Sequence, residues 1–341
     1  MTEYRNILVT GAGGFIGYQL CRYLAQAGYA VTGIDLRYPA DVEQAPFVAE
    51  RGDFRDEGLM KIRLEGSDAV FHLASAHLSI RQDEREYWDI NVHSLPRLLH
   101  QSRRAGVRKF IHVSSVGVYG NLADWPADEQ AICRPQSIYG ETKLAGEAAV
   151  RQFCEKTGLP AVILRPAWVY GPTCPRFQKL YRTLKKGKFV FVGSGSNLRH
   201  PLYIADMLQA LELAMIRDGA DGELLIVGGE QALPTRTIVD SICETMKIAK
   251  PRFRIPYSLG KMLALTVEST SRLIHIEPPV SRRTLEFFDT NNAFDITKAK
   301  RLLGFAPRYS FEEGVRECGL AWGMGHGAWG EAQRAKREEQ R

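Results

Sequence analysis

Short apolar runs alternate with amphipathic segments along the first two-thirds of the chain, and this pattern predicts strands separated by helices. Strands are expected at 7–11, 30–35, 69–75, 109–115 and 161–166. Such alternation is typical of an α/β fold, in which a doubly wound parallel sheet is covered by helices on both faces. Ligands of these folds bind beyond the carboxyl ends of the strands.

The first predicted strand runs into closely spaced glycines in the segment NILVTGAGGFIG, which begins at Asn6. This is the pattern of a phosphate-binding turn. Gly11 allows a tight turn, Gly14 lets the backbone approach a pyrophosphate, and Gly17 lets the next helix pack closely on the sheet. The second strand ends at Asp35, where a carboxylate would bond the adenosine ribose hydroxyls. Together these features predict a Rossmann-type dinucleotide site.

The same aspartate bears on the choice of cofactor. The Asp35 carboxylate favours NAD because it would repel the additional phosphate of NADP. Arg37, two residues later, could reach such a phosphate, although a solvated loop arginine is the simpler interpretation. We expect NAD, with NADP as the less favoured alternative.

Catalytic chemistry is expected where the fourth predicted strand ends and the next helix begins. Tyr139 and Lys143 are four residues apart, so a helix places both side chains on one face. A free tyrosine titrates near ~10, and a nearby ammonium lowers that pKa enough for proton transfer. The Ser115 hydroxyl could hydrogen-bond the same substrate oxygen during hydride transfer, and Ser114 is the less favoured serine.

Beyond Gly171 the alternation fades, and proline- and glycine-bearing segments at 172–175 and 193–195 indicate excursions from the sheet. We expect an NAD-binding domain with the catalytic residues over 1–170. A smaller, mainly substrate-binding domain is expected over 171–322, partly interleaved with the sheet. Residues 323–341 have the composition of a flexible charged tail.

Composition narrows the classes of partner. The 341 residues are 45% hydrophobic and 25% charged, as in a globular chain with a substantial core. The net charge of +6 is modest and the basic residues are scattered until the tail, which argues against a nucleic-acid partner. Six cysteines without a CxxC pair indicate reduced thiols and no metal site. No signal-peptide pattern or membrane-length apolar run is found, so we expect a cytoplasmic protein.

The segment 255–276 has apolar residues at helical spacing, which predicts a helix with one apolar face. Lys261, Glu268 and Arg272 argue against a bilayer-spanning segment. Ordinary domain packing is the leading interpretation of this face. A lid over a hydrophobic substrate and a weak contact with a membrane surface are the alternatives.

Several motifs spread over nearly the whole chain resemble the extended short-chain dehydrogenase/reductases, the NAD-dependent epimerase/dehydratase family. They are TGAGGFIG from Thr10, Gly52-Asp53, HLASA from His72, Asn91-Val92, VSSVGVYG from Val113, YGETK from Tyr139, RPAWVYGP from Arg165 and LGFAP from Leu303. The segment from Phe294 to Trp322 is similar to the hydroxysteroid dehydrogenase-like branch in particular.

The resemblance implies roles for residues that spacing alone does not assign. It implies that Ser115, Tyr139 and Lys143 form the catalytic set, with Lys143 also touching the nicotinamide ribose. The implied cofactor-binding residues are Gly11, Gly14, Phe15, Ile16, Gly17, Asp35, Asp53, Phe54, Leu73, Ala74, Ser75, Asn91, Tyr139, Lys143, Pro166 and Ala167. It also implies a homodimer, formed by the predicted helices over 92–105 and 139–157.

Three residues of the expected substrate site, Ser115, Trp168 and Arg199, bear on the substrate. Nucleotide-sugar enzymes of the group usually have an asparagine where this chain has Trp168, and an indole cannot replace its contact with a diphosphate. Arg199 matches an arginine that those enzymes use on the diphosphate, although a salt-bridged arginine is an equal alternative. His200-Pro201 departs from their pattern.

We therefore expect an NAD-dependent oxidoreductase that acts on a secondary alcohol or ketone of a hydrophobic, sterol-like small molecule. The alternative is a nucleotide-sugar epimerase that passes through a transient keto sugar. Dehydration is disfavoured because Val116-Gly117 stands where dehydratases often have an Asp-Glu pair. A non-catalytic dinucleotide-binding protein is the third reading, which the intact Ser115, Tyr139 and Lys143 disfavour.

Overall fold

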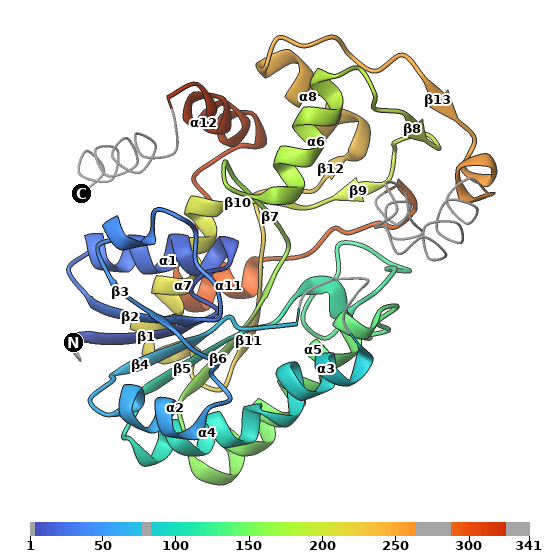
Figure 1. The fold of residues 1–341 in the computed structure, drawn as a ribbon. Coiled ribbons are helices and arrows are strands. Elements are labelled where there is room, and N and C mark those ends of the chain that lie inside the picture. The colour runs from blue at the N-terminus through green and yellow to red at the C-terminus, as the bar shows by residue number, and fades with distance from the viewer. Residues whose placement is uncertain (1–3, 77–82, 263–287, 325–341) are drawn as a thin grey trace.

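The computed structural model describes residues 4–76, 83–262 and 288–324. Its centre is a parallel sheet of seven strands in the order β3-β2-β1-β4-β5-β6-β11 (Figure 1). The strands are β1 (Asn6–Thr10), β2 (Ala30–Asp35), β3 (Val48–Arg51), β4 (Ala69–His72), β5 (Lys109–Val113), β6 (Ala161–Pro166) and β11 (Leu224–Val227). The doubly wound fold expected from the sequence is confirmed.

Helices cover both faces of this sheet. Figure 1 shows α1 (Phe15–Gln26), α7 (Ile204–Ile216) and α11 (Thr297–Leu303) on one side, with α2 (Glu57–Leu64), α4 (Leu95–Arg104) and α5 (Ile138–Thr157) on the other. Neighbouring strand residues alternate between the two sides: Val9 packs in the core beneath α1, whereas Leu8 packs in the core beneath α2. Both faces are buried, so the strands are continuous apolar runs.

All five predicted strands lie in the sheet, and two further strands complete it. β3 has the sequence VAER, whose half-exposed residues carry little apolar signal because it is the edge strand. β11 has the apolar sequence LLIV but follows the point where the alternation fades. α7, β11 and α11 all lie after residue 171 and pack at the sheet, so the chain returns to the sheet more than once.

The remaining elements form a second group, which we call the small layer. It contains α6 (Pro175–Lys185), α8 (Thr235–Thr245), α12 (Phe311–Met324) and three pairs of short strands. The pairs are β10 (Pro201–Tyr203) with β7 (Trp168–Tyr170), β12 (Leu233–Pro234) with β9 (Leu198–Arg199), and β13 (Arg254–Ile255) with β8 (Phe191–Val192). The division into two domains at residue 170 remains a proposal.

Several expected helix boundaries shift. The helix expected over 92–105 begins as α3 (Glu84–Trp88) and a π-helical turn (Asp89–His93), and continues as α4. The helix expected over 139–157 is α5, where the Ser137 side chain accepts a hydrogen bond from Gly140 N and Gly158 ends the helix at φ +69°. Short 3-10 turns occur at Val42–Gln44, Val116–Val118 and Asp218–Ala220.

Two other expectations fall largely outside the described residues. Of the segment 255–276, residues 257–262 are helical and 263–276 are not among those described. The tail expected from residue 323 begins inside α12, which continues to Met324, and 325–341 are not described. Over the described ranges, no helix combines the length and apolar character needed to cross a membrane.

Candidate active site

The glycine turn between β1 and α1 is held by close backbone contacts. Gly11 has φ +76°, and a Cβ there would lie 2.5 Å from Ala74 N. A Cβ on Gly17 would lie 2.1 Å from Gly11 O. Gly14 is the N-cap of α1, which has neither a side-chain cap nor an acidic residue in its first turn. Backbone N–H groups therefore remain for an anion, and the turn fits the pyrophosphate of NAD.

Gly13 is a further glycine of the candidate site that the motif spacing does not single out. Its N–H donates to Asp35 Oδ2 at 2.9 Å, and a Cβ there would lie 1.7 Å from Arg37 O. The other carboxylate oxygen of Asp35 accepts a hydrogen bond from Arg37 N at 3.1 Å. These two hydrogen bonds orient the Asp35 carboxylate. The doubled glycine in GAGGFIG is the sequence feature that could have indicated Gly13.

The other expected cofactor residues lie along the same edge of the sheet. Phe15 and Ile16 form the half-buried first turn of α1, and Leu73, Ala74 and Ser75 follow directly after β4. Pro166 closes β6, and Ala167 N donates to Val227 O at 2.8 Å. Because the strands are parallel, these segments all lie at the carboxyl-end edge, where the sequence placed the cofactor.

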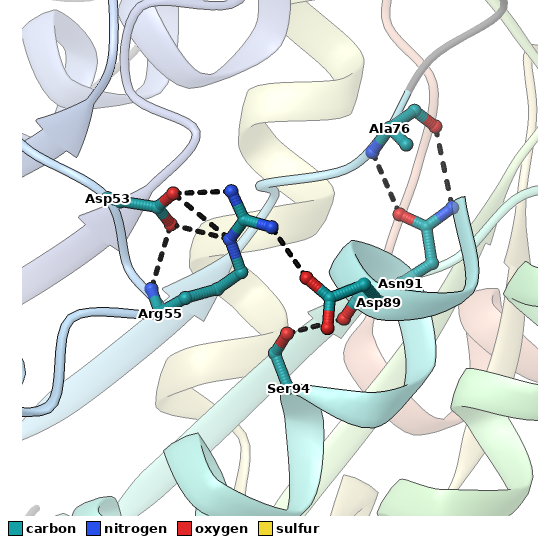
Figure 2. A network of polar contacts seen from close by, with 6 residues as sticks. All are labelled: Asp53, Arg55, Ala76, Asp89, Asn91 and Ser94. Atoms are coloured by element: carbon teal, nitrogen blue, oxygen red, sulfur yellow. Dashed lines mark hydrogen bonds and ion pairs between the residues drawn. The ribbon is translucent and has the colours of Figure 1, made fainter. Parts of the chain in front are cut away.

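Asp53 belongs to an ion-pair network. Figure 2 shows the Arg55 guanidinium between two carboxylates, with Nη2 at 2.6 Å from Asp53 Oδ2 and Nη1 at 2.6 Å from Asp89 Oδ2. Hydrogen bonds from Arg55 lower the pKa of Asp53. Phe54, the next residue, is buried and meets His72 edge to face, with ring centroids 5.0 Å apart. The sequence motif supplied Asp53 but not its partners.

Asn91 is buried and links two segments of the site. Its Oδ1 accepts hydrogen bonds from Ala76 N at 2.9 Å and from the Ser75 hydroxyl at 3.0 Å. Its Nδ2 donates to Thr142 Oγ1 on α5 at 2.9 Å, and Figure 2 shows its carboxamide facing Ala76. The side chain therefore fixes the loop after β4 against the helix that carries Tyr139.

The structure brings the three expected catalytic residues together. A Cβ on Gly117 would lie 3.3 Å from Ser115 Oγ and 3.8 Å from Tyr139 Cε1, so both side chains border the same small space. Ser115 Oγ accepts a hydrogen bond from Gly117 N at 3.1 Å. Lys143 Nζ lies 5.9 Å from the centroid of the Tyr139 ring and donates to Val113 O at 2.9 Å. The one-turn spacing thus has the expected geometry.

Burial tunes Lys143 and two neighbouring histidines. Desolvation lowers the pKa of Lys143 to about 8, although the Glu147 carboxylate raises it. His72 and His112 stack with centroids 5.6 Å apart, and burial holds the pKa of His72 at about 3 and that of His112 well below its usual value. The two imidazoles are therefore neutral, which leaves Lys143 as the cationic side chain of this group.

Behind the catalytic residues lies a buried polar network that the sequence reasoning missed. Arg165 donates to both carboxylate oxygens of Glu147, from Nε at 2.8 Å and from Nη2 at 2.6 Å. The Ser114 hydroxyl donates to the same carboxylate at 2.5 Å, and Arg165 Nη1 donates to Tyr119 OH at 2.6 Å. Ser114 is thus engaged in the interior, which supports Ser115 as the serine of the site.

The two other expected substrate residues lie in the small layer. Trp168 is half-buried among Tyr170, Phe177 and Phe311, with ring centroids 6.0 to 6.5 Å away. Arg199 is buried, and its Nη1 donates to Thr290 Oγ1 at 3.0 Å. In the sequence, Trp168 comes two residues after Pro166, the last residue of β6.

His200 has a structural part in this layer. Phe294 N donates to its Nδ1 at 3.2 Å, so Nε2 carries the proton and donates to Gly229 O at 2.8 Å. Burial lowers the pKa of His200, which keeps the ring neutral. At this position, where the chain departs from the family pattern, the histidine links its own segment to the backbone at Gly229 and at Phe294.

This chain is similar to several known proteins over about nine tenths of its length. N-acetyl-alpha-D-glucosaminyl-diphospho-ditrans,octacis-undecaprenol 4-epimerase of Escherichia coli O157:H7 is 27% identical over 91% of this chain and 93% of its own. Mouse sterol-4-alpha-carboxylate 3-dehydrogenase, decarboxylating, is 26% identical over 92% and 90%. The structure of UDP-glucuronic acid 4-epimerase from Bacillus cereus with NAD matches with a TM-score of 0.74 and 27% identity, over 91% of this chain and 96% of that one.

Residues 7–228 match the family model itself. This span contains the glycine turn, the Ser115, Tyr139 and Lys143 group and the sheet edge that they share. The relatives are dehydrogenases and epimerases of the extended short-chain type. The chain belongs to the NAD-dependent epimerase/dehydratase family, and it is an enzyme of that family's extended short-chain dehydrogenase/reductase class.

Proposed function

We propose that the protein transfers hydride between NAD and a secondary alcohol or ketone of a hydrophobic, sterol-like substrate. The aromatic surroundings of Trp168 carry this proposal, because an indole among Tyr170, Phe177 and Phe311 offers an apolar surface two residues after the end of β6. The binding of Arg199 to Thr290 supports it, since this guanidinium already has a partner within the protein. A sterol dehydrogenase among the relatives agrees with this choice.

In this proposal the protein's side chains transfer the substrate's hydroxyl proton and hydrogen-bond the reacting oxygen. The glycine turn from Gly11 to Gly17 and the Asp35 carboxylate would hold NAD, which would supply the hydride acceptor for the carbinol carbon. The Tyr139 phenolate accepts the hydroxyl proton as the carbon–oxygen bond becomes a carbonyl, and reduction reverses both transfers. Ser115 Oγ hydrogen-bonds the reacting oxygen, and Lys143 favours the phenolate by its charge.

NAD is the proposed cofactor in preference to NADP. The support is Asp35, whose carboxylate is oriented by Gly13 N and Arg37 N and would oppose a ribose phosphate. The dissociation constants of both dinucleotides, measured by calorimetry, test this. NAD should bind at least about tenfold more tightly, a difference of ~1.4 kcal/mol. Tighter binding of NADP would overturn the proposal.

A nucleotide-sugar epimerase is the second candidate, and the names of two of the compared proteins favour it. Such an enzyme would use Tyr139 in the same way and return the hydride to the other face of the sugar. It would retain tightly bound NAD through turnover and produce no net NADH. A non-catalytic dinucleotide-binding protein remains a third proposal, which any turnover excludes.

The experiment is a comparison of two substrate panels, hydroxysteroids with NAD and UDP- or dTDP-sugars, by absorbance of NADH and by mass spectrometry. NADH formed with a hydroxysteroid supports the proposal. A converted nucleotide sugar without net NADH supports the epimerase. Tyr139→Phe should abolish turnover while NAD still binds, whereas Tyr181→Phe removes a phenol from α6 and serves as the matched control. Retained turnover in Tyr139→Phe would reject the catalytic assignment.

Two further expectations stand as proposals. We propose a homodimer formed through α4 and α5, and light scattering at micromolar concentration should give twice the 38.3 kDa chain mass. A monomer mass would contradict it. The cytoplasm is the proposed location, supported by six cysteines that are all unbridged thiols in the structure.

A further inference from the structure

A strongly cationic stretch lies at one end of the small layer. Residues 175–192 contain six lysines and arginines and no aspartate or glutamate. The whole chain has a net charge of +6, so this short stretch alone carries as much charge as the protein's overall excess. The stretch comprises α6, the turn that follows it and β8.

The charges lie on one side of α6. Phe177 and Leu184 are buried, and Tyr181 packs on Trp322 of α12 with ring centroids 4.4 Å apart. At 3.6 residues per turn the basic positions fall on the opposite side of the helix. The exposed basic residues of this side are Arg176, Lys179, Arg182, Lys185 and Lys186, and exposed Lys188 follows the helix.

Exposed apolar side chains adjoin these charges. Phe191 N donates to Phe253 O at 3.1 Å, which continues the β8–β13 pairing by one residue and sets Val190 beside Phe253. Phe253 is 71% exposed and Val190 is 36% exposed. Arg252 and Arg254, both exposed, flank Phe253. Figure 1 shows α6, β8 and β13 in the part of the molecule away from α2 and α4.

We call these eight basic side chains, together with Val190 and Phe253, the cationic face. Within the described residues, none of the eight takes part in a salt bridge. By contrast, nearby Lys250 pairs with Glu244 at 2.5 Å and is not counted here. Lys185 Nζ lies 5.8 Å from the centroid of the Tyr181 ring, and no carboxylate of the described residues pairs with the face, so its charges can attract an outside anion.

We propose that the cationic face docks the protein on an anionic membrane surface, with Phe253 and Val190 entering the interface between head groups and acyl chains. Basic side chains gain from the negative potential of such a surface, and an adjoining aromatic ring adds apolar contact. A nucleic acid would account for the charges but not for the exposed Phe253. The proposal is independent of the substrate, although a hydrophobic substrate would then be met at the membrane.

The test is co-sedimentation of the full chain with vesicles of phosphatidylcholine alone or with 30% phosphatidylglycerol, a composition chosen to be about physiological in charge. Binding should require the anionic lipid and should weaken in about 0.5 M salt, where the Debye length falls to a few ångström. The double variant Lys185→Glu with Lys186→Glu should bind at least about tenfold more weakly. Phe253→Ser should lose roughly fivefold, since apolar contact is removed while charge is kept.

Matched controls change the same properties elsewhere. Lys61→Glu with Arg301→Glu reverses two exposed charges, on α2 and α11, and Ile132→Ser removes a side chain that is 72% exposed. Both should bind anionic vesicles like the unchanged protein. The proposal is overturned if the unchanged protein does not bind them at low salt, if the controls lose as much, or if heparin binds equally well and Phe253→Ser has no effect. NAD binding by every variant shows that it is folded, so a failed membrane test leaves the proposed function untouched.

Discussion

The sheet and the small layer are held together by different forces. In the sheet, strands of four to six residues are completed by buried polar groups, of which the Glu147–Arg165 pair is the clearest, with both side chains no more than 4% exposed. In the small layer, strands of two or three residues are completed by aromatic rings such as Tyr170 and Phe311, whose centroids are 5.1 Å apart. Buried polar contacts therefore add to the apolar cores on the two faces of the sheet, whereas aromatic rings contribute much of the packing in the small layer.

This difference suits the work proposed for each region. Hydride and proton transfer require atoms held to within a fraction of an ångström, which the hydrogen bonds around Ser114 and Lys143 provide. Recognition of an apolar substrate requires shape and surface, which aromatic side chains provide. Removing a buried polar partner should therefore have its largest effect at the sheet, and removing an aromatic contact should be felt in the small layer.

The largest expected effect comes from breaking the buried pair. Glu147→Ala leaves the Arg165 guanidinium buried without its carboxylate, so the free energy of unfolding should fall by about 3 to 5 kcal/mol. Urea denaturation followed by circular dichroism measures this. Glu57→Ala removes an exposed pair with Arg97, at 3.0 Å, and should cost at most about 1 kcal/mol. Equal losses in the two variants would contradict the contrast between buried and exposed pairs.

A second test places a methyl group in the glycine turn. In Gly17→Ala the new Cβ would lie 2.1 Å from Gly11 O, so the backbone must move, at a cost of about 3 kcal/mol. NAD affinity, measured by calorimetry, should fall at least about tenfold because the turn cradles the pyrophosphate. Gly219→Ala is the control, since a Cβ there meets nothing within 4 Å. Unchanged NAD affinity in Gly17→Ala would show that the glycine turn does not bind the pyrophosphate.

The third test uses pH at the junction of the two regions. Asp206 at the start of α7 accepts hydrogen bonds from Arg308 N at 2.9 Å and Tyr309 N at 3.3 Å, yet burial raises its pKa from 3.8 to about 6. The folded protein therefore binds this proton more tightly than the unfolded chain does. Its contribution is complete below about pH 4 and is lost as the pH rises through about 6.

Between pH 4 and 7 the free energy of unfolding should fall by about 2 to 3 kcal/mol because Asp206 ionises. This fall should be absent in Asp206→Asn. Asp295 is the opposite control, because its hydrogen bonds to Thr297 lower its pKa and its contribution is lost as the pH falls. Denaturant titrations at a series of pH values measure both slopes. A profile of Asp206→Asn parallel to that of the unchanged protein would show that the carboxyl is not the responsible group.

The same contrast explains what the sequence could and could not predict. The turn at Gly11 to Gly17 and the Tyr139–Lys143 pair are local patterns, so spacing located them. The pairing of Glu147 with Arg165 joins residues of different elements, and nothing in either segment marks the partner. The edge strand β3 is half-exposed and therefore lacks a strong apolar pattern.

The small layer was harder to predict for a physical reason. Strands of two residues, such as β8 and β13, are too short to show any periodicity, so they form only where tertiary contacts bring them together. Trp168 and Arg199 were identified by resemblance, but the Thr290 contact that engages Arg199 lies 91 residues away in the chain. Spacing cannot supply a contact of that kind.

The smallest expected effect sharpens the picture of the small layer as a packed aromatic region. Tyr181 on α6 and Trp322 on α12 have ring centroids 4.4 Å apart. A double-mutant cycle of Tyr181→Leu and Trp322→Leu, measured by urea denaturation, should give a coupling energy of about 0.5 to 1.5 kcal/mol. Tyr18 and Trp322 share no ring contact within the described residues, so a cycle of Tyr18→Leu with Trp322→Leu should be additive. A coupling energy near zero for the first pair would mean that the buried Phe177 and Leu184, rather than the aromatic pair, position α6. The small layer would then be packed in the same way as the apolar cores of the sheet.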